Sequence, residues 1–154
     1  MINKKVFKPI SHEYKVMAIE MVEPEILLRL VVAAVAGGLI GFERSVANKP
    51  AGLRTLMLVG MGAALFTVVS TTSFTGDDSA KMLAGIVTGI GFLGAGTIFR
   101  AEDHVRGLTT AASMWTVAAI GIAAGLGEYG ITIAATVLVI LILQLGRIEF
   151  LREH

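Results

Sequence analysis

The stretch YGITIAATVLVILILQLG, residues 129–146, decides how the rest of the sequence is read. After its first residue, Tyr129, the only polar side chains are two threonines and one glutamine. A helix of a soluble protein needs a polar stripe that recurs on every turn. This stretch lacks such a stripe, and its length is close to the ~20 residues that cross a bilayer. We therefore predict a transmembrane helix here rather than a buried helix of a soluble domain.

Four further apolar stretches of similar length precede this one, and short charged linkers separate them. They cover about residues 26–42, 53–74, 80–99 and 108–126. Backbone groups in lipid must find hydrogen-bond partners within their own segment, so these stretches should be helices. The predicted fold is all-α and integral to the membrane: a compact bundle of about five transmembrane helices over residues 26–146. Residues 1–25 form a polar or interfacial segment, either a surface helix or a disordered tail, and residues 147–154 form a short cytoplasmic tail.

The composition excludes several classes of protein. The chain is 55% hydrophobic and 16% charged, whereas a soluble domain has about a quarter charged residues. The net charge of +1 and the lack of a basic stripe argue against nucleic acid. The sequence has no cysteine, and His12, His104 and His154 do not have the spacing of metal ligands. Because no catalytic set of residues appears either, we expect no enzymatic activity.

Lysine and arginine favour the cytoplasmic side of a membrane. With five spans, one side receives Arg44, Lys49, Arg54, Arg100, Arg106, Arg147 and Arg152. The linkers on the other side hold Asp77, Asp78, Lys81 and Glu128. We predict a cytoplasmic C-terminus and an external N-terminus, with the first span acting as an uncleaved anchor. The N-terminal lysines oppose this orientation, but four glutamates before residue 26 offset them.

Small residues should hold the spans together, because they let helix backbones approach closely in lipid. The glycines expected at helix contacts are Gly37, Gly41, Gly85, Gly89, Gly91, Gly94 and Gly96. Ala33, Gly60, Ala64, Gly121 and Gly125 extend this pattern to the other early spans. We predict that the first four spans form the core and that the fifth faces lipid or a partner. The glycines of the third span could instead break its helix and expose carbonyls to an ion, but close packing is favoured.

Two charged groups are candidate sites. On the inner face, Glu43, Arg44, Arg54, Arg100 and Arg106 are predicted to cluster, with Glu43 paired to Arg54 or Arg106. Such a cluster could bind an anion, a lipid phosphate or a partner protein, or it could serve only as a topology signal. On the outer face, Asp77, Asp78 and Glu128 could hold Mg²⁺. The alternative there is that the two aspartates cap the third span.

Three further expectations concern residues within the spans. Arg29 lies about one turn inside the first span, so it needs a partner, which we predict to be Asp77 or Asp78. A narrow polar seam could run along Thr88, Thr97, Thr109, Thr110 and Ser113, although such hydroxyls commonly bond carbonyls of their own helix. Trp115 lies mid-span, which favours packing in the core.

Four segments carry a resemblance to a known family. They are GGLIGFER at residues 37–44, KPAGLRT at 49–55, GIGFLGAG at 89–96 and RGLTTAASMW at 106–115. In this order and spacing they resemble the MgtC/SapB family of bacterial inner-membrane proteins over about residues 26–146. The resemblance implies a small helical membrane module linked to growth under magnesium limitation and, in some pathogens, to virulence. Family members are thought to regulate other membrane proteins, including the rotary ATP synthase, rather than to catalyse a reaction.

The sequence departs from the family pattern in three places. Leu56 stands where many members have histidine, and residues 123–125 lack the cysteine that some members have there. The chain also ends at His154, without the cytoplasmic domain of the longer members. A short, SapB-like module fits these departures better than a full virulence factor does.

Two functions are compatible with these features, and a purely structural or stress-related role is a weaker third. The first is a non-enzymatic regulator that docks to another membrane protein. The second is a small oligomeric transporter of Mg²⁺, another ion or a solute. A homodimer is plausible for so small a bundle, and Mg²⁺ is the only cofactor considered. A transporter should have a continuous polar lining, whereas a regulator should have a dry core packed through glycines.

Overall fold

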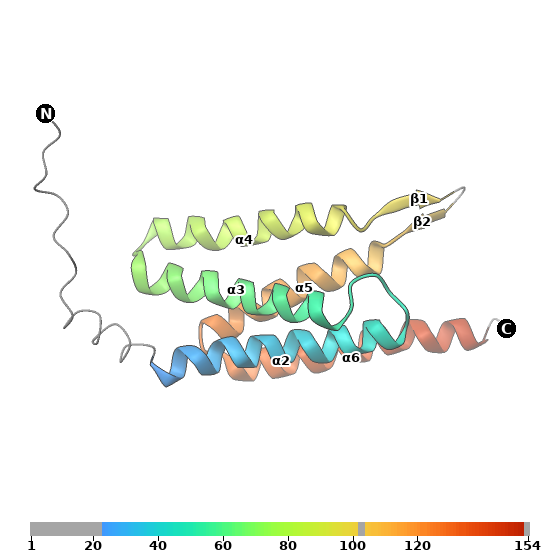
Figure 1. Ribbon diagram of the computed structural model, residues 1–154, viewed down its shortest axis with the longest axis horizontal. Helices are drawn as coiled ribbons and strands as arrows, with labels where there is room; N and C mark the ends of the chain where they lie inside the picture. Colours follow the sequence, from blue (N-terminus) through green and yellow to red (C-terminus); the bar gives the residue numbers. More distant parts are fainter. Residues whose placement is uncertain (1–22, 102–103, 153–154) are drawn as a thin grey trace, which may run out of the picture.

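The computed structural model describes residues 23–101 and 104–152. These residues form five helices and one two-stranded hairpin (Figure 1). The elements are α2 (Pro24–Val46), α3 (Leu53–Ser73), α4 (Asp77–Ala95), β1 (Phe99–Ala101), β2 (His104–Arg106), α5 (Leu108–Gly125) and α6 (Tyr129–Arg152). The predicted N-terminal segment up to residue 22, including His12, and the C-terminal His154 lie outside the described residues.

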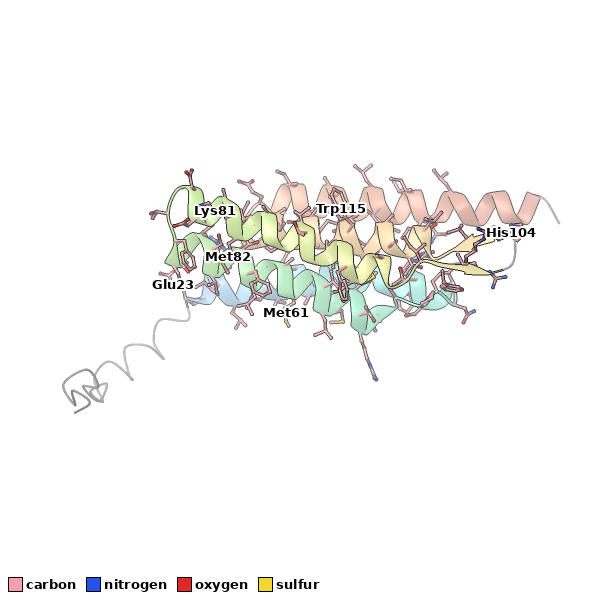
Figure 2. All side chains as sticks on the ribbon, turned by 90° about the horizontal axis from the view of Figure 1, so that it is seen from above. Glu23, Met61, Lys81, Met82, His104 and Trp115 are labelled. Atoms are coloured by element: carbon pink, nitrogen blue, oxygen red, sulfur yellow. The ribbon has the colours of Figure 1, made fainter. Side chains whose placement is uncertain are left out.

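The helices lie side by side along one long axis, and their connections alternate between the two ends of the bundle (Figure 1). Figure 2 shows Glu23 and Lys81 at one end and His104 at the other. We call the end with the 47–52 linker and the hairpin the charged end, and the other the opposite end. Among the described residues, α2, α3 and α5 are each long and apolar enough to cross a membrane, and α6 contributes the shorter apolar stretch Tyr129–Leu145. The prediction of a mostly helical, apolar membrane architecture is confirmed.

Helix α2 is longer than the predicted span at both ends. It begins at Pro24, because proline at the first helical position forfeits no intrahelical hydrogen bond. Glu25 in the first turn and Arg44 in the last both suit the helix dipole. Glu43 and Arg44 therefore belong to the helix itself, and not to the linker that follows it.

The predicted third span, residues 80–99, is wrong at its C-terminal end. Helix α4 ends at Ala95, and Phe99 pairs with Arg106 in an antiparallel hairpin, next to the pair Arg100–Val105. Apolar residues after the helix made the span look longer than it is. Gly107 joins the hairpin to α5 at φ +91°, where any side chain would collide with the Thr97 carbonyl.

The core is built from α2, α3 and α5, which meet backbone to backbone. A methyl group on Gly60 of α3 would lie 2.7 Å from the Ala33 carbonyl oxygen of α2. One on Gly121 of α5 would collide with the Gly60 carbonyl and would lie 2.8 Å from the Cβ of Ala63. Gly37, Gly41 and Gly125 also face neighbouring helices at distances that no side chain fits. Leu56, Ile40 and Val117 fill the space between these contacts and are fully buried.

The prediction that the third span belongs to the core is wrong. On α4, only Ile90 and Gly94 are buried, and methyl groups on Gly85, Gly89 or Gly91 would meet nothing within 4 Å. A methyl group on Gly94 would lie an ordinary 3.5 Å from the Cβ of Ala111 of α5, and one on Gly96 would meet only carbonyls of its own helix. Helix α6, which has no glycine between residues 131 and 145, packs against α2 and α5 and buries Thr132 and Thr136. Most other side chains of α6 up to residue 145, among them Ile131, Ile142 and Leu145, are exposed, which agrees with the prediction that the fifth span lies outside the core.

The predicted place of Trp115 is also wrong. Its side chain is 53% exposed on α5. The buried face of α5 instead carries small and aliphatic residues, among them Met114, Val117, Ala118 and Gly121. A large indole would not fit between backbones that approach as closely as these do.

Candidate functional site

Five charged residues that the sequence singled out lie at the charged end of the bundle. Glu43 and Arg44 occupy the last turn of α2, Arg54 the first turn of α3, Arg100 lies on β1 and Arg106 on β2. The antiparallel connections bring these elements to one end (Figure 1). They differ sharply in burial, however, because Glu43 and Arg44 are inside the protein whereas Arg54, Arg100 and Arg106 are exposed.

Glu43 and Arg44 form a buried pair. Nη1 of Arg44 lies 3.6 Å from Oε2 of Glu43, and Arg44 and Glu43 are 4% and 9% exposed, respectively. Both extend the buried stripe of α2, since Glu43 lies three residues after Ile40 and Arg44 lies three after Gly41. The prediction that Glu43 pairs with Arg54 or Arg106 is wrong. The reason is geometric: the last turn of α2 faces inward at Glu43, whereas Arg54 and Arg106 point to the surface.

This pair is not fully satisfied by the described part of the chain. Oε2 of Glu43 and Nε of Arg44 are buried and have no hydrogen-bond partner there. Burying a charge is expensive unless ion pairing and hydrogen bonds together replace the lost water. Each orphaned atom typically costs about 1–3 kcal/mol. The pair therefore contributes little to stability, and a bound group could supply the hydrogen bonds that these two atoms lack.

Hydrogen bonds fix the linker that follows the pair, residues 47–52. The Lys49 amide donates to the Arg44 carbonyl at 2.9 Å, and the Leu53 amide donates to Oγ of Ser45 at 2.9 Å. Glycine at position 41 lets the start of α3 come close to α2, since a methyl group on Gly41 would lie 2.8 Å from the Cα of Leu53. These contacts fix where α3 begins, and so they fix the position of Arg54.

The two arginines of the hairpin point to opposite faces. Arg100 pairs with Val105, and Arg106 pairs with Phe99. Successive side chains alternate between the two faces of a strand pair, and paired residues share a face. Arg100 and Arg106 therefore cannot act as a single site on one face of the hairpin.

The acidic residues at the opposite end do not form a metal site in the described chain. Asp77, Asp78 and Glu128 are all exposed, and Asp78 accepts a hydrogen bond from Nζ of Lys81 at 2.9 Å. No group of three or more histidine, aspartate or glutamate residues that could hold a metal ion occurs among the described residues. Asp77 and Asp78 do lie in the first turn of α4, where a negative charge suits the helix dipole.

Arg29 joins three helices at the opposite end, and its predicted partner is wrong. Its Nε donates to Oε1 of Glu25 at 3.2 Å, and its Nη1 donates to the carbonyl of Gly125, at the end of α5, at 3.1 Å. Tyr129, the first residue of α6, donates to the same Glu25 oxygen at 2.7 Å. The prediction had chosen Asp77 or Asp78 and overlooked Glu25, one turn earlier on the same helix. The spacing of four residues was the signal that could have found this partner.

The predicted polar seam is dispersed. Thr88 and Thr109 are exposed, Thr97 is half-buried, and Thr110 and Ser113 are buried. Thr88 donates to the Ala84 carbonyl, Thr97 to Gly94 and Ser113 to Thr109. The hydroxyl protons of these three residues are thus taken up by the helix that carries them or by the turn at its end, and the five residues differ widely in exposure.

These features define a multi-pass helical membrane protein with a buried charge pair at one end. The chain belongs to the MgtC family, whose family model matches residues 30–149. This confirms the resemblance that its four motifs carry.

Curated relatives agree with this assignment. The chain is 44% identical over 128 residues to "Putative magnesium transporter YhiD" of Escherichia coli (strain K12), which covers 78% of this chain and 60% of that protein. It is 46% identical over 114 residues to "Protein MgtC" of Salmonella typhimurium (strain LT2), covering 74% and 49% of the two chains. It is 43% identical over 143 residues to "Protein MgtC" of Brucella abortus (strain 2308), covering 92% and 54%. The chain thus spans about half to three-fifths of the length of these relatives, and no solved structure matches it.

Proposed function

We propose that this chain is a non-enzymatic regulator that docks to another membrane protein of the bacterial inner membrane through its charged end. The observation that carries the proposal is the buried Glu43–Arg44 pair, whose two orphaned atoms belong to the end of the bundle that also presents Arg54 and Arg106. Arginine is enriched at protein interfaces, and a partner that completes a buried pair gains charge-assisted hydrogen bonds. The magnesium-related names of the relatives suggest magnesium limitation as the condition in which it acts.

The membrane arrangement is part of this proposal. We place five helices across the bilayer, with the core packed through glycine and alanine and the charged end on the cytoplasmic side. Arg44, Lys49, Arg54, Arg100 and Arg106 at that end support this orientation, since lysine and arginine favour the cytoplasm. The C-terminus of α6 lies at the same end (Figure 1). In this arrangement a cytoplasmic or juxtamembrane surface of the partner meets Arg54 and Arg106.

A charge-reversal series tests the docking role. The double variant Arg54→Glu/Arg106→Glu should fold normally, because both side chains are exposed, yet it should fail to support growth of a deletion strain at low magnesium. A photo-crosslinker at position 54 should capture one membrane protein, and Glu43→Lys should abolish that capture. The matched control is Lys81→Glu, whose side chain is 74% exposed at the opposite end and should change neither readout. Normal growth with the double variant, together with unchanged capture in the Glu43→Lys variant, would refute the proposal.

A transporter is the second candidate, and the printed name of the Escherichia coli relative favours it. Buried hydroxyls could assist a cation, because Thr67, Thr132 and Thr136 donate their protons to carbonyls but keep free lone pairs. We expect the chain to form a homodimer in either case. Purified protein in liposomes loaded with a Mg²⁺-sensitive dye separates the two functions. A regulator gives the same leak as empty liposomes, whereas a transporter gives protein-dependent flux that saturates with Mg²⁺.

A further inference from the structure

An apolar groove of about 810 Å³ lies between α3 and α4, and α5 forms its floor. In Figure 1, α4 runs along α3 on the side away from α2. Large side chains such as Leu58, Phe66, Ile86 and Leu93 form the walls, and Met114 lies on the floor. This groove is separate from the buried charge pair, which lies on α2.

The groove exists because its walls carry glycine where the two helices face each other. Gly62 of α3 and Gly85 and Gly89 of α4 line it, and a methyl group on any of them would meet nothing within 4 Å. In the core of this protein, glycine brings backbones into contact. Here it does the reverse and leaves an unfilled space.

One end of the groove carries a positive charge. Of its lining residues, Arg54 is the only charged one, and the neighbouring Thr55 is the only other polar one. The described ion pairs do not include Arg54, whose side chain lies at the surface of the charged end. The ligand that suits this lining has an anionic head and a long apolar tail.

The length of the groove identifies the kind of amphiphile. The helical stretch from Arg54 to Phe66 covers about 18 Å at 1.5 Å per residue. This is close to half of the ~30 Å hydrocarbon core, which is the depth of one leaflet. A second transmembrane helix would need a groove that continues through both leaflets.

We propose that this groove binds one anionic phospholipid of the cytoplasmic leaflet, with its phosphate at Arg54 and an acyl chain between α3 and α4. Thr55 offers a hydroxyl to the head group, and Phe66 and Ile86 contact the chain. The proposal rests on the same orientation in the membrane as the docking role and shares Arg54 with it. Its test uses the chain alone in lipid vesicles, without a protein partner, so either role can fail without the other.

Fluorescence quenching by brominated lipids tests it on the full chain. The chain has one tryptophan, so Trp115→Phe gives a silent background. A reporter Phe66→Trp then senses the groove, and Phe42→Trp, on the exposed face of α2, senses bulk lipid. In phosphatidylcholine vesicles, brominated phosphatidylglycerol should quench the groove reporter at about fivefold lower mole fraction than brominated phosphatidylcholine does. The bulk reporter should show no such preference.

Two variants locate the binding. Arg54→Gln should remove the preference for the anionic lipid while leaving the fold intact, because the side chain is exposed. Gly89→Leu should also remove it by filling the groove, and Gly130→Leu, equally unobstructed but outside the groove, should retain it. Equal quenching by both lipids in the unmodified groove would overturn the proposal. So would a groove reporter that neither lipid quenches, which would indicate that a protein helix covers it.

Discussion

Arg44 and Glu43, two neighbours in the sequence, are each other's buried ionic partners, with 3.6 Å between Nη1 and Oε2. An ion pair between adjacent helical residues is unusual, because side chains one residue apart project in different directions. Here both residues are buried, and the described ion pairs give neither of them another partner. The pair also leaves two polar atoms unsatisfied, which separates it from an ordinary surface salt bridge.

Removing one member of this pair should destabilise the protein more than removing both. Glu43→Leu leaves the Arg44 guanidinium buried without a counter-charge, at an expected loss of about 3 kcal/mol in the free energy of unfolding. The double variant Glu43→Leu/Arg44→Met should be close to wild type in stability. Equilibrium unfolding in mixed micelles measures both values. A single variant as stable as wild type would show that solvent reaches the pair.

The same glycine substitution should have opposite effects in two helices. Gly121→Ala places a methyl group against the Gly60 carbonyl and Ala63, so we expect a loss of about 1–3 kcal/mol from overpacking. Gly85→Ala meets nothing within 4 Å and should stabilise the protein by about 0.5–1 kcal/mol through helix propensity. Thermal unfolding in detergent gives both values. If the two variants lost equal stability, glycine would matter here only through the flexibility of the chain.

Arg29 should matter more than any acidic residue at the start of α4. Arg29→Gln removes the contact with Glu25 and the hydrogen bond to the Gly125 carbonyl, with an expected loss of about 1–2 kcal/mol. Asp78→Asn removes only an exposed pair with Lys81 and should change stability by less than about 0.5 kcal/mol. Unfolding curves of the two variants, measured side by side, decide the order. A larger loss of stability for Asp78→Asn than for Arg29→Gln would support the predicted pairing of Arg29 with Asp78 instead.

The hairpin can be tested by crosslinking, because the chain has no cysteine of its own. Arg100 and Val105 are paired across the two strands, so Arg100→Cys/Val105→Cys should form an intramolecular disulfide on mild oxidation. Arg100→Cys/Arg106→Cys is the matched control, and it should stay reduced because its side chains point to opposite faces. Mass spectrometry of the oxidised protein distinguishes the two. Equal crosslinking of both pairs would mean that the strands slip in register.

The sequence was a good guide to the helices and a poorer guide to their neighbours. Hydropathy marked α2, α3 and α5 well, because an uninterrupted apolar run of about 20 residues is rare outside membrane-spanning helices. It extended the third span into the hairpin, since Ile98 and Phe99 are apolar wherever they lie. A local average over the sequence does not record that the helix ends at Ala95 and that the chain then enters a strand.

Pair contacts were harder to predict, because spacing along one helix does not reveal which faces meet. Glycine spacing pointed equally to Gly37 and Gly85, yet the first touches a neighbouring backbone and the second lines a groove. Arg29 and Glu43 were both assigned distant partners, whereas each has a charged partner on its own helix, at Glu25 and Arg44. Partners close in the sequence were the better prediction, because forming such a pair costs no loop-closure entropy.

Gly60 lies where the backbones of α2, α3 and α5 come into contact. Its α-carbon abuts the Ala33 carbonyl of α2, and its own carbonyl abuts Gly121 of α5. Sliding of any one of these helices must drive one backbone into another, so the trio moves as a rigid body. Helices α4 and α6 share no such glycine contact with the trio, and a swing of α4 away from α3 would widen the space between them.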